Sequence, residues 1–440
     1  MRILVLSKYY IPEIAAPCFR VADHARVWIE QGHEVTVVTC APHFPRGNVY
    51  EGYRNRLYQE EMIDGVKVIR LWTYTAANEG VLKRIVNYLS FMFMAIVMCW
   101  KYPKFDVCVA TSGPFFTAVA GFFVSLFRRR PWIFEIRDLW PASVASVGAM
   151  KGWPIRMLEK VELFLYRRSH RIVSLTNSFK QNLIDRGIDG NKNDVITNGV
   201  DVDRFQSDLD LSVARERLGV AQDAFLLGYI GTIGMAHGLR TVLDAAQKLQ
   251  DHPRVHFVLI GDGAERAGLE AYAAERNLQN VTFSDYVPHD QIPAYLSALD
   301  MSVVHLKPDP LFLTVIPSKI FESMAVGTPI LMAVQGESAQ IVSDTGSGFC
   351  IPSGDSDVMA QTIRELESDR ERLASMSHRG RDAVATQYSR EANAMKFIAS
   401  MQAAIDTWNG VKTQPDTIAF PNTQPTAASS SSTTEKRKAA

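Results

Sequence analysis

The sequence predicts an α/β protein made of two doubly wound domains in tandem. Short apolar runs alternate with helical patterns through most of the 440 residues. The apolar runs are continuous rather than alternating in polarity, which is typical of strands buried on both faces of a parallel sheet. This rhythm stops at a polar stretch over residues 201–224 and then restarts. A length of about 150 residues per domain agrees with two or three domains.

The first half of the chain contains the signals of one such domain, which we expect over residues 1–200. The expected strands are 2–7, 34–39, 66–72, 106–111, 132–137, 171–176 and 194–197. Helical patterns lie between them near 18–31, 81–101, 114–127, 154–169 and 178–186. Strands that alternate with helices in this way indicate a parallel sheet covered by helices.

The second half repeats the pattern, and we expect a second domain over residues 201–389. Its expected strands are 225–231, 255–260, 281–283, 301–306, 329–333 and 348–351. Its expected helices are 239–250, 264–276, 290–298, 317–326 and 355–373. A last helix over 390–409 should pack back toward the N-terminal domain. Residues 411–440 are rich in Thr, Pro, Ser and Ala, which predicts a disordered tail.

The net charge of zero conceals a split between the two halves. The 47 basic residues cancel the 47 acidic ones, which argues against a general nucleic-acid binder. Residues 1–200 hold 26 Lys and Arg against 17 Asp and Glu, or +9, whereas residues 201–410 hold 17 against 28, or −11. A basic half can face an anionic membrane or substrate. The alternative is a chance distribution of charge over a solvated surface.

The cysteines and the N-terminus indicate a cytoplasmic protein. The five cysteines are scattered without a CxxC pair, which suits reduced thiols. Met1 and Arg2 lead directly into the first apolar run, so we expect no signal peptide.

Residues 85–100 form an apolar segment with basic ends. Its 16 residues fall short of the ~20 that span a bilayer. It fits either a buried helix or a helix that lies in a membrane interface. A second apolar stretch, 115–127, precedes three arginines and favours the interfacial interpretation.

Several loops at expected strand ends have the residues of an anion site. The loop 7–17 contains the small residues Ala15 and Ala16 and leads into a helix, whose N-terminus attracts anions. Gly231 ends the first strand of the second domain, and Gly261-Asp262-Gly263 repeats this arrangement one unit later. No GxGxxG is present, which disfavours a dinucleotide-dependent dehydrogenase.

The strongest local signal is the segment 316–330. Pro317 and Ser318 suit a helix start. Lys319 in the first turn opposes the helix dipole, so its presence there needs another reason. Glu322 lies one turn after Ser318, and its carboxylate could accept hydrogen bonds from vicinal hydroxyls, as on a ribose. A plain solvated residue is the alternative for Glu322.

Charged residues also mark the expected strand 132–137. Glu135 and Arg137 alternate with apolar residues, and burying them is costly unless they pair or face a ligand. Asp138, at the strand tip, is a candidate polar contact to a substrate, with a simple turn cap as the alternative.

Together the tandem domains, the segment Pro317–Pro329, the Asn198–Asp201 turn and the Glu135–Pro141 strand end resemble glycosyltransferase family four. Members of this family are retaining, metal-independent enzymes of GT-B architecture, with a cleft between two Rossmann-like domains. The likeness covers residues 1 to about 409. It is closest to the branch that includes L-fucosamine and colanic-acid sugar transferases of bacterial surface polysaccharide synthesis.

The resemblance implies roles for individual residues of a donor site. Glu322 would hold the nucleotide ribose, and Asp138 would orient the acceptor or the sugar, so these two are the catalytic candidates. The other expected donor contacts are Ala15, Ala16, Gly231, His237, Arg240, Gly261, Asp262, Gly263, Val287, Thr314, Ile316, Pro317, Ser318 and Lys319. Lys319 would substitute for the basic pair that the family often has at the diphosphate. The expected acceptor-side residues are Glu13, Arg20 and Arg137.

One departure from the family pattern concerns the donor sugar. The family has an acidic residue eight positions before Glu322, where this chain has Thr314. A deoxy or amino-deoxy sugar such as N-acetyl-L-fucosamine, with fewer hydroxyls, would need that carboxylate less.

The resemblance therefore implies transfer of a sugar from a UDP-sugar to a polyprenyl-linked saccharide in O-antigen, capsule or exopolysaccharide synthesis. It implies no metal or other cofactor and no nucleic-acid partner. The basic half and its apolar helices suggest a peripheral protein on the anionic inner face of the cell membrane. The alternatives are a UDP-sugar 2-epimerase on the same two-domain scaffold and a non-catalytic nucleotide-sugar binder.

Overall fold

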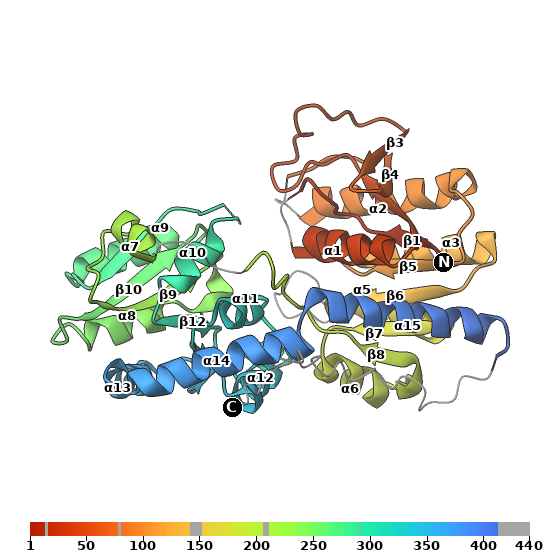
Figure 1. Cartoon of the computed structure of the whole chain (residues 1–440). Coiled ribbons are helices and arrows are strands. Elements are labelled where there is room, and N and C mark those ends of the chain that lie inside the picture. The colour runs from red at the N-terminus through yellow and green to blue at the C-terminus, as the bar shows by residue number, and fades with distance from the viewer. Residues whose placement is uncertain (14–15, 78–80, 141–151, 206–210, 289, 412–440) are drawn as a thin grey trace, which may run out of the picture.

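The computed structural model describes residues 1–13, 16–77, 81–140, 152–205, 211–288 and 290–411. It contains two α/β domains that lie side by side (Figure 1). The predicted disordered tail, from residue 412 on, and Ala15 lie outside the described residues.

The N-terminal domain is built on an eight-stranded sheet with the order β3-β4-β2-β1-β5-β6-β7-β8. Its strands are β1 (Arg2–Leu6), β2 (Glu34–Cys40), β3 (Tyr58–Ile63), β4 (Val66–Leu71), β5 (Val107–Thr111), β6 (Trp132–Ile136), β7 (Arg171–Ser174) and β8 (Asn193–Val195). Its helices are α1 (Ala16–Glu30), α2 (Val81–Val97), α3 (Phe115–Arg128), α5 (Trp153–Arg168) and α6 (Asn177–Asp185), with the 3-10 turns η1 (Met98–Lys101) and η2 (Gly190–Lys192).

The C-terminal domain is built on a six-stranded sheet with the order β11-β10-β9-β12-β13-β14. Its strands are β9 (Phe225–Ile230), β10 (Val255–Ile260), β11 (Val281–Ser284), β12 (Met301–His305), β13 (Ile330–Ala333) and β14 (Gly348–Cys350). Its helices are α7 (Leu211–Arg217), α8 (Arg240–Gln247), α9 (Arg266–Glu275), α10 (Ile292–Ser297), α11 (Lys319–Val326), α12 (Glu337–Thr345), α13 (Ser356–Glu367) and α14 (Arg370–Gln387), with the turns η3 (Met235–His237) and η4 (Pro310–Thr314).

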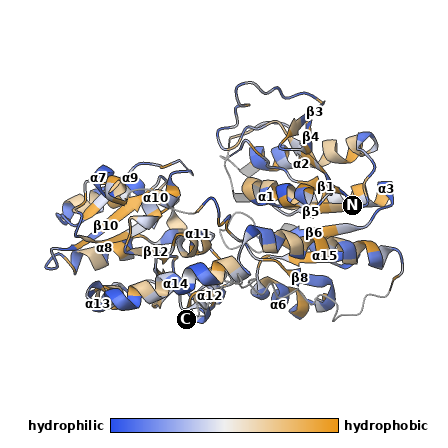
Figure 2. Cartoon of the chain, in the orientation of Figure 1, coloured by the Kyte–Doolittle hydropathy of each residue, from blue (hydrophilic) through white to orange (hydrophobic). Residues whose placement is uncertain are grey.

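Both sheets are buried on both faces, as the continuous apolar runs predict. Along β1, Leu4 and Leu6 belong to one core cluster, whereas Ile3 and Val5 belong to the cluster on the opposite face. All five residues of β5 are buried. Figure 2 shows that the strands of both sheets are mostly hydrophobic. The predicted fold class, two doubly wound α/β domains, is confirmed.

Several elements differ from the sequence expectation. Strand β3 pairs antiparallel with β4 at the edge of the sheet and was not expected, because Gln59, Glu60 and Glu61 interrupt its apolar residues. The helix expected over 355–373 is two helices, since the Asp369 carboxylate accepts a hydrogen bond from the Arg372 N–H at 3.0 Å and starts α14 anew. Helices α7 and α12 were also missed, since 7 and 9 residues are too few for a clear apolar period.

The last helix, α15 (Arg390–Trp408), returns to the N-terminal domain and packs against α1 and β7 (Figure 1). The Trp28 indole N–H donates to the Ala394 carbonyl at 3.1 Å, and the Trp28 and Phe397 ring centroids are 5.4 Å apart. Arg390 forms an ion pair with Asp23 of α1. The chain therefore crosses between the domains twice, near residue 200 and near residue 389, and these crossings pair at Val200 and Ser389.

The carboxyl edges of the two sheets meet at Glu337. This residue follows β13, and its carboxylate accepts hydrogen bonds from the backbone N–H groups of Asn177 and Ser178, each at 2.9 Å. The Asn177 amide and the Ser178 hydroxyl donate to the same carboxylate at 3.0 and 2.9 Å. Asn177 begins α6, directly after β7, so a carboxylate from one domain caps a helix of the other.

We predict that Glu337→Ala loosens the contact between the domains. The substitution removes the four hydrogen bonds and should lower the free energy of unfolding by about 1–2 kcal/mol, the typical value of a helix cap. Small-angle scattering should show a larger radius of gyration. Asp344→Ala is the control, because Asp344 lies on the same helix and its described hydrogen bond joins it only to Gln340. An unchanged radius of gyration for Glu337→Ala would contradict a role for this contact in domain orientation.

Candidate functional site

The centre of the candidate donor site is the ammonium group of Lys319, at the start of α11. It lies 3.7 Å from the centroid of the Tyr229 ring, which supplies a cation–π contact. It is also 3.0 Å from the point that a side chain on Gly231 would occupy. Strand β9 positions Tyr229 and Gly231, so the carboxyl end of this strand and the N-terminus of α11 meet at the ammonium.

Lys319 has an unusual electrostatic environment. Its Nζ atom is buried and has no hydrogen-bond partner among the described residues. Burial lowers the pKa of Lys319 to about 8, although the negative charge of Glu322 acts in the opposite direction. A buried cation without hydrogen bonds is costly, so this arrangement is explained if an anion completes it.

His237 also packs near the Tyr229 ring. Its ring centroid is 5.8 Å from that of Tyr229. Burial and the positive charge of Lys319 lower the pKa of His237 to about 4, so this histidine is neutral at pH 7. A neutral imidazole can donate a hydrogen bond to an anion but adds no charge. Of the two, Lys319 is therefore the group that supplies positive charge.

The two glycine turns pack against each other. A side chain on Gly261 would lie 2.0 Å from the Gly231 carbonyl oxygen, and one on Gly263 would lie 2.3 Å from that of Ile233. Only glycine fits at these close approaches of backbone to backbone. Gly261 and Gly263 thus shape the loop that holds Gly231 beside Lys319. The Asp262 carboxylate accepts a hydrogen bond from the Gly263 N–H at 2.7 Å.

Glu322 lies one turn further along α11 than Lys319 and is half-buried. Burial raises its pKa, while the positive charges of Lys319, Arg390 and Arg204 lower it. Arg390 and Arg204 belong to the two crossings between the domains. The Glu322 carboxylate therefore lies where the C-terminal domain approaches these crossings, which sequence reasoning did not foresee.

The remaining predicted donor residues lie around these groups or form the core beneath them. Ile316 and Val287 are buried in the hydrophobic core, whereas Thr314 ends η4, and Pro317 and Ser318 lie directly before α11. Ala16 begins α1 of the N-terminal domain. Arg240 points elsewhere, since its guanidinium lies 4.2 Å from the centroid of the Tyr272 ring on α9.

The buried guanidinium of Arg20 joins strand β6 to the chain segment that follows β8. It donates to Glu135 at 2.8 Å and to the carbonyls of Ile196 and Thr197 at 2.8 and 2.7 Å. Burial raises the pKa of Glu135, but the charges of Arg20 and Arg137 outweigh it and the net pKa is lowered. The sequence predicted that Arg20 lies on the acceptor side; the structure shows that it fixes the chain leading into the first crossing.

Arg137 and Asp138 follow β6 at the carboxyl edge of the sheet. The Arg137 N–H donates to the Ser112 hydroxyl at 2.9 Å, and one guanidinium nitrogen is buried without a partner among the described residues. The Asp138 side chain is exposed to solvent. Partial desolvation by nearby residues raises the pKa of its carboxyl, while the positive charge of Arg137 lowers it. Asp138 is thus available to a ligand at this edge.

Glu13 belongs to a buried polar cluster at the same edge of the sheet. One carboxylate oxygen accepts hydrogen bonds from the His43 and Phe44 N–H groups at 2.8 and 2.9 Å. The other oxygen has no partner among the described residues. Burial raises the pKa of Glu13, and the bonds from His43 and Phe44 lower it. Its first oxygen therefore orders the loop after β2.

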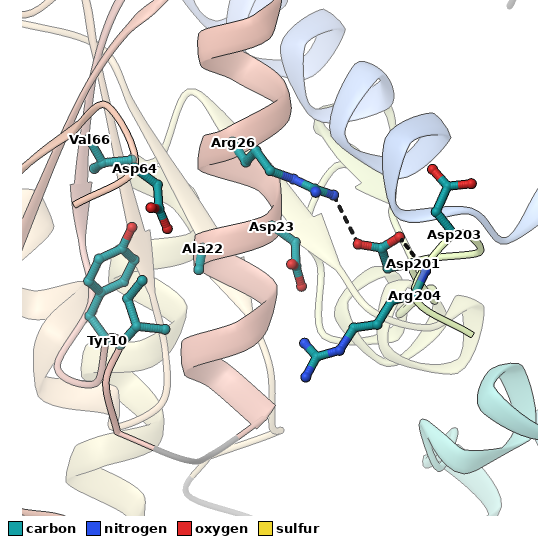
Figure 3. Close-up of a pocket in the computed structure, with 10 residues that line it drawn as sticks. Tyr10, Ala22, Asp23, Arg26, Asp64, Val66, Asp201, Asp203 and Arg204 are labelled. Atoms are coloured by element: carbon teal, nitrogen blue, oxygen red, sulfur yellow. Dashed lines mark hydrogen bonds and ion pairs between the residues drawn. The ribbon is translucent and has the colours of Figure 1, made fainter. Parts of the chain in front are cut away.

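A pocket of about 400 Å³ lies beside α1 (Figure 3). Its charged lining residues are Asp23, Arg26, Asp64, Asp201, Asp203 and Arg204. Arg26 and Asp201 form an ion pair of 3.0 Å across it (Figure 3). None of the predicted site residues lines this pocket, although Arg204 lies close enough to influence Glu322.

The described residues contain no group of three or more His, Cys, Asp or Glu placed to hold a metal ion.

Two doubly wound domains in tandem, with their carboxyl edges facing each other, are the architecture of a GT-B protein. Two family models match the chain in the same two halves. One, described as "Glycosyl transferase 4-like domain", matches residues 19–199, and the other, "Glycosyl transferases group 1", matches residues 212–383. The chain therefore belongs to the GT-B glycosyltransferases of the family-four type.

Bacterial glycosyltransferases are among the relatives of this chain. The chain is 26% identical over 377 residues to WcaI of Escherichia coli (strain K12), whose name assigns it to colanic acid biosynthesis; the match covers 83% of this chain and 92% of WcaI. It is 25% identical over 280 residues to the glycosyltransferase WbjE of Pseudomonas aeruginosa, covering 62% of this chain and 68% of WbjE.

Solved structures confirm the fold. Anabaena HepE in complex with UDP superposes with a TM-score of 0.68 at 18% identity, over 92% of this chain and all of that one. Sucrose-phosphate synthase of Thermosynechococcus elongatus superposes with a TM-score of 0.72 at 18% identity, over 92% of this chain and 99% of that one. At this level of identity the likeness shows the architecture alone.

Sequence reasoning missed Tyr229, Arg204 and Arg390. The signal for Tyr229 was present, because residues two apart lie on the same face of a strand and Tyr229 thus shares a face with Gly231. The Tyr229 hydroxyl donates to the Thr232 carbonyl at 2.7 Å. Arg204 and Arg390 had no signal in the sequence, because their distance from Glu322 depends on how the two crossings between the domains pack together.

We predict that Arg20→Met destabilises the protein rather than altering substrate affinity. It leaves Glu135 buried without its partner, which should cost about 3–5 kcal/mol in the free energy of unfolding. Chemical denaturation measures this loss. Arg26→Met is the control, because Arg26 forms an exposed ion pair worth about 0–1 kcal/mol. An equal loss of unfolding free energy in both variants would contradict the structural role of Arg20.

We predict opposite effects of Lys319→Met on stability and on UDP binding. The folded-state pKa of about 8 lies below the ordinary value of 10.5, so the buried ammonium destabilises the native state below pH 8. The variant should melt at a higher temperature at pH 7, and this gain should shrink as the pH rises from 8 toward 10.5. UDP should bind at least about tenfold more weakly, the loss expected of one charge-assisted hydrogen bond. A variant that is less stable and binds UDP unchanged would show that Lys319 is only structural.

Proposed function

We propose that the protein is a retaining glycosyltransferase that transfers a sugar from a UDP-sugar to a lipid-linked saccharide. The observation that carries the proposal is the Lys319 ammonium, which is buried, lacks a hydrogen-bond partner among the described residues and faces Gly231. A diphosphate supplies the negative charge and the acceptor atoms that this ammonium lacks.

The same arrangement suits departure of the diphosphate. When the bond between the sugar and the diphosphate breaks, negative charge develops on the leaving oxygen. The ammonium of Lys319 and the N-terminus of α11 can stabilise this charge without reorganising. A protein cation in this place supports a metal-independent reaction. Asp138 would orient the acceptor or the sugar, and Glu322 would accept hydrogen bonds from the ribose hydroxyls.

The proposed donor sugar is an amino-deoxy hexose such as N-acetyl-L-fucosamine. The argument depends on Thr314, which stands eight residues before Glu322 where the family has a carboxylate. A threonine hydroxyl is a weaker hydrogen-bond acceptor than a carboxylate. A sugar with fewer hydroxyls loses less by this exchange.

The names of similar proteins support this proposal. Anabaena HepE has been crystallised with UDP and with UDP-glucose, and WcaI is named for colanic acid biosynthesis. We therefore propose a polyprenyl-linked acceptor in O-antigen, capsule or exopolysaccharide synthesis, and a peripheral site of action on the cytoplasmic face of the membrane. The comparisons give no support for the epimerase alternative.

We predict that UDP and UDP-sugars raise the melting temperature of the protein, because a ligand of the native state stabilises it by mass action. Glu322→Ala should weaken UDP binding about 10- to 100-fold, the value of hydrogen bonds to one charged group. Asp344→Ala should bind UDP like the wild type.

For the donor sugar, turnover of UDP-N-acetyl-fucosamine should exceed that of UDP-glucose; equal or better turnover of UDP-glucose would refute the donor assignment. Conversion of a UDP-sugar without acceptor would instead indicate an epimerase.

A further inference from the structure

Helix α2 presents a continuous apolar stripe to solvent. Together with η1 it exposes six apolar side chains, each between 37% and 74% exposed: Leu82, Val86, Leu89, Phe93, Val97 and Trp100. Their spacing of three or four residues places them on one side of the helix. The opposite side is buried in the domain core through Phe91, Met94 and Ala95. The exposed stripe is thus additional to the residues that fold the domain.

Helices α3 and α5 extend this surface. The Trp100 and Phe127 rings are stacked with centroids 6.3 Å apart, and Phe127 continues to Phe123 at 6.0 Å. Phe122 joins Phe123 and Phe164 at 5.3 Å each. Further exposed apolar side chains are Leu126, Trp153 and Met157. We call the exposed apolar residues of α2, η1, α3 and α5 the apolar face.

The charge around the apolar face is strongly positive. Within the described residues of 82–104, 115–130 and 152–168, the only acidic residues are Glu159 and Glu162, and Glu162 pairs with Arg186. The same segments expose ten basic residues: Lys83, Arg84, Lys101, Lys104, Arg129, Arg130, Arg156, Lys160, Arg167 and Arg168. A second copy of this chain would bring two such positive surfaces together, whereas an anionic lipid surface complements both the charge and the apolar stripe.

The helix cannot cross the bilayer without losing its inner contacts. By length and composition alone, residues Leu82–Lys101 could span a membrane. However, the Asn87 amide on the inner side bonds to His43 Nε2 at 3.0 Å, and the Asn87 carbonyl accepts from the Thr73 hydroxyl at 3.1 Å. Spanning would remove these groups from their partners in the domain core. Lying flat keeps them.

We infer that the apolar face docks on an anionic lipid bilayer, with α2 in the plane of the interface and the side chains of Leu82, Phe93 and Trp100 inserted. The inference deepens the proposed function, because a lipid-linked acceptor would be met at this surface. Arg84 and Tyr88 of α2 line a small cavity with Tyr9 and His43, which follow β1 and β2. The docked helix would therefore begin at the carboxyl edge where Asp138 lies, and the saccharide could extend from the bilayer to that edge.

The test is flotation of the full chain with vesicles of phosphatidylcholine and phosphatidylglycerol. The wild type should float with these vesicles at low salt and bind less to phosphatidylcholine alone. The double variant Phe93→Glu and Trp100→Glu should bind at least about tenfold more weakly. Its control is Met62→Glu with Met395→Glu, which changes charge equally at exposed residues of β3 and α15. Lys101→Gln with Lys104→Gln leaves the apolar stripe intact and should weaken binding in a salt-dependent way.

Three results would overturn the inference. The wild type could remain in the soluble fraction, or the two Glu double variants could lose binding equally. Light scattering could also show that the Phe93 and Trp100 variant dissociates a dimer without any change in vesicle binding. UDP-induced stabilisation is measured on the same samples. Wild-type flotation together with absent UDP binding would refute the proposed function alone, and normal UDP binding without flotation would refute the docking face alone.

Discussion

The ammonium of Lys319 is the group on which the candidate site depends. It is buried above the Tyr229 ring, and it opposes the dipole of the helix that carries it. Gly231 has a φ of +139°, which favours glycine, and a side chain there would approach the ammonium to 3.0 Å; the tight turns at Gly261 and Gly263 hold Gly231 in place. Burial lowers the pKa of His237 and the charge of Lys319 adds to this effect, while the same charge opposes the rise that burial causes in the pKa of Glu322. A residue that costs stability and organises its neighbours in this way is typical of a binding site.

The two domains are coupled at points that frame this site. Arg20 fixes the chain before the first crossing, and Arg390 joins the second crossing to α1 through Asp23. Glu337 caps α6 across the interface. The crossings also bring Arg204 and Arg390 within electrostatic reach of Glu322. Any change in domain orientation therefore changes the electrostatic field at the Glu322 carboxylate.

The sequence allowed the fold to be predicted, because it depends on local patterns, and a local pattern also singled out Lys319, whose role in a donor site stays a prediction. Continuous apolar runs indicate buried parallel strands, and a lysine against the dipole of α11 indicates a functional residue. The edge strand β3 was missed because its polar residues lack that pattern. The role of Arg20 was also beyond reach, since its partners Glu135 and Ile196 are more than 100 residues away. Likewise, the sequence could not distinguish a fully buried α2 from a helix with one exposed apolar side. The structure distinguishes them, because only one side of α2 packs in the core.

The most direct test of this account is the pKa of Lys319, measured by NMR titration of the isotope-labelled side-chain amine with and without UDP. The account predicts a pKa of about 8 in the free protein and a clear rise when UDP is bound, because the diphosphate stabilises the ammonium. A pKa near the ordinary value of 10.5 that does not respond to UDP would contradict the central role of this residue.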